Sequence, residues 1–174
     1  MPPSVLSFDE LLDSAERSAV HLEMRDVYAV SHENEHFRMW KETGVRPTDP
    51  DSPYWKAWTT LIRRTVARGV QVRRARIVSE PVSEYVRYGY AGAPVNLAAG
   101  EQVRWLPRRR ASDIALPGND FWLIDDRLIR WNHFTGDGAS AGGEMCDDPA
   151  VANLCATAFE SVWARAVPHS EFTV

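Results

Sequence analysis

The sequence predicts an α/β fold, a mixed sheet with flanking helices, from three observations. An apolar run at 121–124 is interrupted by an Asp-Asp pair and resumes as Leu128-Ile129-Arg130-Trp131, which is typical of a buried hairpin. Between residues 151 and 166, apolar side chains recur at steps of three and four, which predicts a helix that covers the sheet. Residues 70–107 show the order strand, helix, strand, which is typical of a parallel α/β sheet.

The composition fits one globular domain. The chain has 174 residues, of which 44% are hydrophobic and 25% are charged, close to ordinary usage. We expect a single domain over 1–174, with an N-terminal helix and strand extension (1–50) and a core (53–166). No apolar run approaches the ~20 residues of a membrane helix, and the start lacks the basic segment of a signal peptide. These features predict a cytoplasmic protein with no membrane partner.

The extension is expected to hold a helix, a strand and a second helix. Ser7 and Glu10 match a capping box, which predicts a short helix. Residues 19–25 alternate apolar and polar, which predicts a half-buried strand with His21 on its polar face. An amphipathic helix is expected over 35–43.

The first half of the core is expected to begin with a helix and a strand. Ser52 and Pro53 suit the start of a helix that ends at Gly69. The following segment, 70–78, is rich in β-branched residues and is expected to be a strand. Its apolar phase changes near Arg74, which predicts a bulge or a sheet-edge twist at that point.

The second half of the core is expected to begin with a short helix and a strand. The helix opens at Ser83 and is expected to end between Gly89 and Pro94, and the strand covers 101–107. After the hairpin, a Gly-rich turn leads to Asp148, the predicted N-cap of the last helix.

Charge is unevenly distributed along the chain. The net charge is −4, yet the segment 61–110 holds eleven arginines and three glutamates and is therefore +8, which leaves −12 for the remainder. Such a split indicates a surface that attracts an acidic partner. The candidate residues for binding phosphate or nucleic acid are Arg73, Arg74, Arg76, Arg104, Arg108, Arg109 and Arg110.

Three local patterns carry a resemblance to a known fold. A helix passes into a strand through Gly69-Val70, a later strand ends in Ile124-Asp125-Asp126, and the last helix runs from Asp148-Pro149 to a Phe and a Trp. In this order and spacing, residues 53–166 resemble one half of a phospholipase D-type fold. The whole chain also resembles an actinobacterial family of uncharacterised proteins that are often encoded beside helix-turn-helix regulators. The resemblances imply such a regulator as a protein partner, and pairing of two halves in a homodimer.

The phospholipase D signature is incomplete. It consists of a His, a Lys two residues on and an Asp five beyond the Lys. With Asp125 as the Asp, the other two positions hold Gly118 and Asp120. Because the nucleophile and the group that neutralises phosphate are both missing, the resemblance implies a catalytically degenerate cleft with no catalytic residue. The candidate residues of that cleft are Asp120, Asp125 and His133.

No metal or cofactor is expected. Cys146 and Cys155 lack the spacing of a zinc site. His32 and His36 are four residues apart, as helical zinc ligands are, but they stand in a wholly polar run. Asp120, Asp125, Asp126 and His133 could hold a hard cation, although a solvated turn is the favoured interpretation.

Three functional hypotheses follow. The first is a non-catalytic regulatory or interaction module, which acts with a helix-turn-helix transcriptional regulator or binds an effector. The second is binding of nucleic acid or a phosphate ligand through the arginines. The third is a phosphodiesterase with an unrecognised site.

Overall fold

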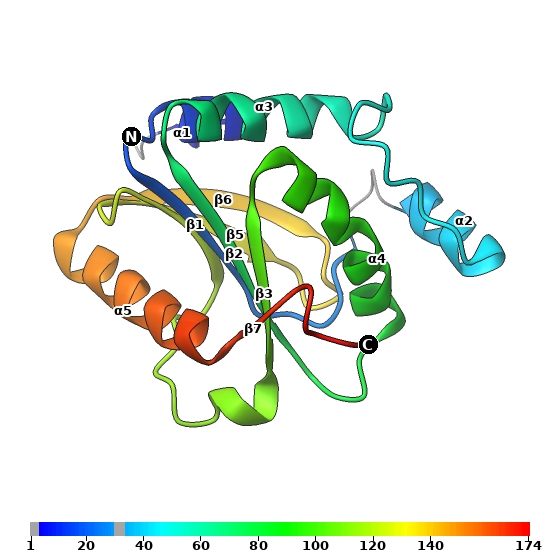
Figure 1. The fold of residues 1–174 in the computed structure, drawn as a ribbon. Coiled ribbons are helices and arrows are strands. Elements are labelled where there is room, and N and C mark those ends of the chain that lie inside the picture. Colours follow the sequence, from blue (N-terminus) through cyan, green and yellow to red (C-terminus); the bar gives the residue numbers. More distant parts are fainter. Residues whose placement is uncertain (1–3, 30–33) are drawn as a thin grey trace.

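A seven-stranded mixed sheet forms the centre of the molecule. The computed structural model describes residues 4–29 and 34–174 (Figure 1). Within these residues, the strand order is β6-β5-β4-β1-β2-β3-β7. The β1–β2 and β2–β3 pairs are parallel and the others antiparallel, which confirms the predicted α/β class. The strands are β1 (Ser18–Glu23), β2 (Gln71–Val78), β3 (Gln102–Pro107), β4 (Asp120–Ile124), β5 (Leu128–Phe134), β6 (Ser140–Cys146) and β7 (Val167–Pro168).

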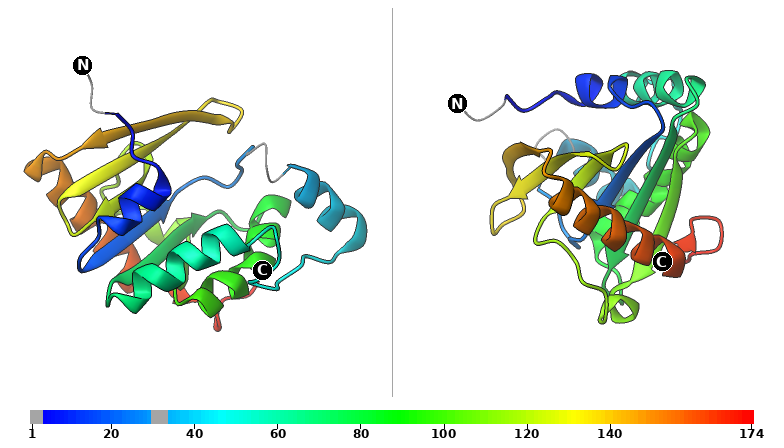
Figure 2. Two further views of the ribbon diagram at one scale, coloured as in Figure 1. Left: turned by 90° about the horizontal axis from the view of Figure 1, so that it is seen from above. Right: turned by 90° about the vertical axis from the view of Figure 1, so that its left-hand side faces the viewer.

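Helices cover both faces of the sheet. They are α1 (Phe8–Asp13), α2 (Asn34–Thr43), α3 (Lys56–Ala67), α4 (Glu84–Ala99) and α5 (Pro149–Arg165), with a 3-10 turn, η1 (Arg108–Ala111). Helix α5 buries Phe159 and Val162 against one face, and α3 buries Leu61 and Ile62 against the other. Figure 1 shows α5 on the opposite side of the strands from α3 and α4, and Figure 2 shows α1 and α3 together above the sheet.

Local signals in the sequence place three elements correctly. Ser7 and Glu10 form the predicted capping box at the start of α1. Strands β4 and β5 form the predicted hairpin, and its turn residues Asp125 and Asp126 have φ of 51° and 57°. The carboxylate of Asp148 accepts hydrogen bonds from the first N–H groups of α5, as predicted for an N-cap.

Strand β1 is buried on both faces, and so the prediction of a half-buried strand is wrong. It lies between β2 and β4, with helices on either side. As a result, His21 is only 8% exposed. The sequence had placed this strand in an extension before the core, whereas its hydrogen bonds make it a central part of the sheet.

Helix α4 is the largest departure from the predicted elements. It continues past Gly89 and includes Pro94, and it ends only where Gly100 adopts a φ of 104°. The end predicted between Gly89 and Pro94 is therefore wrong. Burial of Ala93 and Val95, both 0% exposed, supports the helix across the region that contains the proline.

Three smaller corrections concern segments with weak signals. Helix α3 begins at Lys56, because the residues from Ser52 to Trp55 form a turn before it. Strand β2 pairs without interruption on both sides, so it has neither the bulge nor the sheet-edge twist predicted at Arg74. The Gly-rich segment after the hairpin contains strand β6 in addition to a turn.

None of the helices among the described residues has the length and apolar character needed to span a membrane. Of the two histidines that stand four residues apart, His32 lies outside the described residues, whereas His36 belongs to α2.

Candidate ligand-binding pocket

A cavity of about 470 Å3 opens on the face of the sheet that carries α1, α3 and α4. We call it the α4 pocket. This volume lies within the range of small-molecule sites, ~300–1000 Å3. Strands β1, β2, β4, β5 and β6 contribute to it, together with α4 and the loop 44–55. Among the described residues, nine aromatic side chains line it: Phe8, Tyr28, Tyr54, Trp55, Trp58, Tyr85, Tyr88, Trp122 and Phe134.

The register of the sheet aligns the polar side chains of the pocket. His21 of β1 is paired with Arg74 of β2 on one side and with Trp122 of β4 on the other. Trp122 is in turn paired with Arg130 of β5. Because directly paired residues project from the same face of a sheet, these four side chains form one row across four strands.

A buried ionic network forms the floor of the pocket around Glu23. The Oε1 atom of Glu23 lies 2.6 Å from Nη1 of Arg74, and Oε2 lies 2.9 Å from Nε of Arg76. Arg74 also donates from Nε to Glu101 at 2.6 Å. Burial opposes the ionisation of Glu23, but Arg76 and Arg74 outweigh it and lower the pKa of Glu23 to about 2. Glu23 is therefore ionised at neutral pH.

His21 is a neutral part of the pocket wall. Its ring stacks on the indole of Trp122, with 4.4 Å between centroids and 15° between planes. Burial lowers the pKa of His21 to about 3, against the opposing effect of Glu23. The contact of 3.4 Å between its Nδ1 and Glu23 is therefore a polar contact and not an ion pair at neutral pH.

Arg130 carries a partly buried charge that has no ion-pair partner among the described residues. It donates from Nη1 to Asn132 at 2.5 Å, and its guanidinium lies 4.2 Å from the centre of the Phe8 ring. No carboxylate of the described residues forms an ion pair with it, and its buried Nε has no hydrogen-bond acceptor there. Burial accordingly lowers the pKa of Arg130.

Asp120 is the titratable carboxyl group of the pocket. It accepts hydrogen bonds from the Tyr28 hydroxyl and, at 2.9 Å, from the N–H of Met24. Burial raises the pKa of Asp120 to about 6, with a further contribution from Glu23, although the two hydrogen bonds oppose the increase. Asp120 therefore changes its charge just below neutral pH.

Two glycines of α4 make room for two arginines. A Cβ atom on Gly89 would lie 2.4 Å from Nη1 of Arg76, and one on Gly92 would lie 2.4 Å from the guanidinium of Arg46. Arg46 donates to the carbonyl of Tyr88, and its guanidinium lies 3.5 Å from the centre of that ring. The glycines that appeared to end a helix thus allow these two guanidinium groups to pack directly against α4.

The arginines singled out in the sequence do not form one surface. Arg74 and Arg76 face the α4 pocket, whereas Arg73 points to the α5 side, where it bonds to Glu160 at 2.6 Å. Arg104 also lies on the α5 side and donates to the carbonyl of Trp163 at 3.0 Å.

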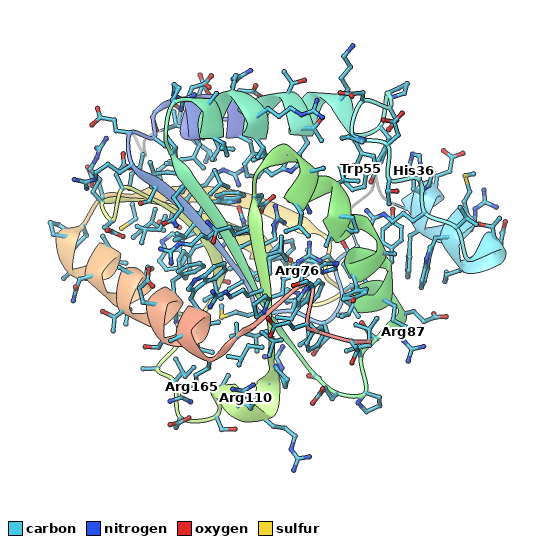
Figure 3. The ribbon with its side chains drawn as sticks, viewed as in Figure 1. His36, Trp55, Arg76, Arg87, Arg110 and Arg165 are labelled. Atoms are coloured by element: carbon cyan, nitrogen blue, oxygen red, sulfur yellow. The ribbon has the colours of Figure 1, made fainter. Side chains whose placement is uncertain are left out.

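The three remaining arginines belong to the end of β3 and to η1. Arg108 is held by Ser79 and by the carbonyl of Met24. Arg109 and Arg110 are exposed. Figure 3 shows Arg110 near Arg165 at the lower end of the molecule, away from Arg76.

The structure brings two of the three residues of the predicted degenerate cleft to one pocket and places the third elsewhere. Asp120 lines the α4 pocket, and His133, also at the pocket, lies 3.3 Å from Glu144. Asp125 stands at the other end of β4, where its carboxylate accepts three backbone N–H groups. Among the described residues, no three His, Cys, Asp or Glu side chains gather as metal ligands would.

Sequence reasoning missed Arg130 and most of the aromatic lining. One signal was present: the apolar phase of residues 70–78 changes because Arg74 and Arg76 occupy inward positions of an unbroken strand. When charged residues interrupt the apolar pattern of a central strand, a buried polar site explains the interruption at least as well as a bulge does.

Fold and site together define a mixed α/β domain with a charged pocket lined by aromatic side chains. The chain belongs to the family described as "Domain of unknown function (DUF6879)", whose model matches residues 6–174. No functionally curated protein matches the sequence.

Among solved structures, the chain is similar to an archaeal chromatin protein, TrmBL2, which is described as showing a novel mode of DNA binding. The sequence identity is 10% and the TM-score 0.47, and the match covers 91% of this chain and 48% of the other. This chain therefore spans about half the length of that protein. A likeness at this score supports no statement about function.

Proposed function

We propose that this protein is a non-catalytic, effector-binding module that takes a small organic ligand into the α4 pocket. The observation that carries the proposal is the composition of the pocket. A sheet face covered by helices normally carries apolar side chains, but here Glu23, Arg74 and Arg76 occupy such positions beside a cavity of about 470 Å3. Buried charges lower stability unless they are paired, so their presence beside a cavity favours binding over a purely structural role.

The state of the polar groups supports the non-catalytic part of the proposal. His21 is neutral and stacked on Trp122, so it is poorly placed to accept a proton from a ligand. Asp120 is already an acceptor for Tyr28 and Met24. General acid–base catalysis needs a group free to reach the reacting atom.

A ligand panel tests the proposal. Thermal shifts of the purified chain should identify compounds that raise the melting temperature, because a ligand that binds only the folded state stabilises it. Replacing Ser140, which lines the pocket, by Trp should weaken that shift. Ala141→Trp is the matched control, since the neighbouring side chain of a strand points to the other face and does not line the pocket. Equal shifts for the two variants would argue against the pocket as the site.

Binding of nucleic acid or of a phosphate ligand by the arginines is a second candidate with less support. Arg73 and Arg104 lie on the opposite face of the sheet from Arg74 and Arg76. Mobility shifts at low and high salt decide this question, because phosphate contacts weaken steeply with salt. For the phosphodiesterase hypothesis, turnover of a phosphodiester that is lost in His133→Ala would count against a non-catalytic module.

The expected partner is also a proposal. We propose a helix-turn-helix regulator as the protein partner and the cytoplasm as the location. We also propose that two phospholipase D-like halves pair in a homodimer. The sequence resemblance is the basis of these proposals. Light scattering and a pull-down with and without ligand test the two ideas separately.

A further inference from the structure

We propose that the α4 pocket binds a planar aromatic monocarboxylate whose carboxylate pairs with Arg130. This inference rests on the proposed function, to which it adds the chemical class of the ligand. Three observations carry it: a guanidinium without an anionic partner, the charge of the pocket, and the aromatic lining.

Arg130 supplies the anion-binding group. Among the described residues it has no carboxylate partner, and its Nε lacks an acceptor. Within the described part of the chain, Arg130 donates a hydrogen bond to Asn132, which also lines the pocket, and other donors of the guanidinium are left for a ligand. A carboxylate is planar and matches two parallel N–H groups of arginine.

The charge of the pocket favours one negative charge on the ligand. Glu23 is paired with Arg74 and Arg76, and among the described residues no carboxylate forms an ion pair with Arg130. A monocarboxylate would match the single charge of Arg130. A phosphomonoester, at about −1.5 to −2 at neutral pH, would leave excess negative charge in a partly buried site.

The rest of the lining favours a flat ring. Trp58 and Trp122 meet edge to face with centroids 6.1 Å apart, and Phe134 contacts Tyr28 in the same way at 5.0 Å. Aromatic rings prefer edge-to-face or offset contacts with one another, so an aromatic ligand finds several partners here.

Four compounds of one shape test the ligand class. Calorimetric titration of the full chain at neutral pH would compare naphthoate with naphthamide, naphthyl phosphate and the saturated decalin carboxylate. Naphthoate should bind about 10- to 100-fold more tightly than the neutral amide, the ratio expected for a hydrogen-bonded charge. It should also bind more tightly than the phosphate and the saturated acid.

Variants of two arginines on the same hairpin test the anchor. Arg130→Met should remove the preference for naphthoate over naphthamide without lowering the melting temperature, because it removes a charge that the protein leaves unpaired. Arg127→Met is the control, since Arg127 is exposed at the turn and does not line the pocket. A lower melting temperature together with unchanged naphthoate binding in Arg130→Met would make Arg130 structural and overturn the proposal.

The outcomes separate this inference from the proposed function. Equal binding of acid and amide, or tighter binding of the phosphate, would overturn the ligand class and leave the pocket as a binding site. Failure of all four compounds would also overturn the class. The proposed function itself fails only if the broad panel gives no ligand sensitive to Ser140→Trp.

Discussion

The carboxylate of Asp125 fastens the β4–β5 turn to the start of β1. It accepts N–H groups of Glu16, Arg17 and Ser18 at 2.9, 2.8 and 2.9 Å. Burial would raise its pKa, but these hydrogen bonds outweigh burial and lower it. One carboxylate thus supplies the hydrogen-bond acceptor for the backbone N–H groups of three successive residues.

Asp125→Ala should therefore destabilise the fold by about 2–4 kcal/mol, because it leaves these N–H groups without their acceptor. Asp126→Ala is the matched control: it stands in the same turn with φ of 57°, against 51° for Asp125, so the backbone strain of alanine is similar. Denaturant unfolding measures both. Equal losses of stability would mean that the turn conformation matters and the carboxylate does not.

Asp120 gives the stability a defined dependence on pH. Its pKa in the folded protein is raised to about 6, from an ordinary value of 3.8. A carboxyl group with a raised pKa stabilises the fold below the unfolded pKa, and this contribution is lost as pH rises through the folded pKa. Unfolding free energies should accordingly fall between pH ~4 and pH ~6.

Asp120→Asn should reduce the decrease in unfolding free energy between pH ~4 and pH ~6, and it should raise the melting temperature at neutral pH. An amide keeps the shape of the side chain and can still hydrogen-bond with Tyr28 and Met24, but it carries no charge to bury. Melting temperatures of both proteins over this pH range provide the measurement. An unchanged slope in the variant would assign the pH dependence to another group.

At the scale of elements, α4 is positioned by contacts with distant parts of the chain. The space above Gly89 is filled by Arg76 of β2, and the space above Gly92 by Arg46 of the loop before α3. At the end of the chain, the carbonyl of Phe172 accepts from the Tyr90 hydroxyl at 2.7 Å. These contacts hold the helix over the pocket.

A double-mutant cycle tests the fit between Gly89 and Arg76. Alanine usually stabilises a helix interior by up to about 1 kcal/mol relative to glycine. In the natural sequence, Gly89→Ala should lack this gain, because the new Cβ would displace Arg76 from Glu23. In the Arg76→Met background, the same change should be stabilising. Equal effects in both backgrounds, measured by denaturant unfolding, would contradict the close packing.

The elements that the sequence predicted well are those marked by local chemistry. The caps Ser7 and Asp148 bind backbone N–H groups two or three residues away, and the Asp-Asp pair forms a turn by its own backbone conformation. These signals can therefore be recognised in a short stretch of sequence. The sequence predicts too short a helix for α4, because Gly89 and Pro94 are unfavourable within an isolated helix. Tertiary burial and the two arginines override that preference, and neither can be read from a short window of sequence.

At the scale of the whole molecule, the sheet joins segments that are far apart in the sequence. The row of pocket residues combines His21, Arg74, Trp122 and Arg130, which belong to four strands. No spacing along the chain predicts such a row, because it depends on the register of each strand pair. The arginines of segment 61–110 were equally misleading as a group, since they are divided between the two faces of the sheet.

The central position of β1 predicts that the core cannot fold without the first fifty residues. A fragment of residues 51–174 would leave β2 and β4 without the strand that joins them. It should therefore show little cooperative thermal unfolding by circular dichroism. Removal of the exposed residues 173–174 is the control and should have little effect. A cooperatively folded fragment would support an independent core.

Strand β6 ends the sheet, so one side of its backbone has no strand partner in the described part of the chain. Natural sheets often protect such edges with lysine or proline, but Ser140–Cys146 has neither, and Glu144 is its one charged residue. At high protein concentration, we therefore expect molecules to associate through edge-to-edge pairing of this strand. Ala141→Lys should make concentrated solutions less prone to precipitation.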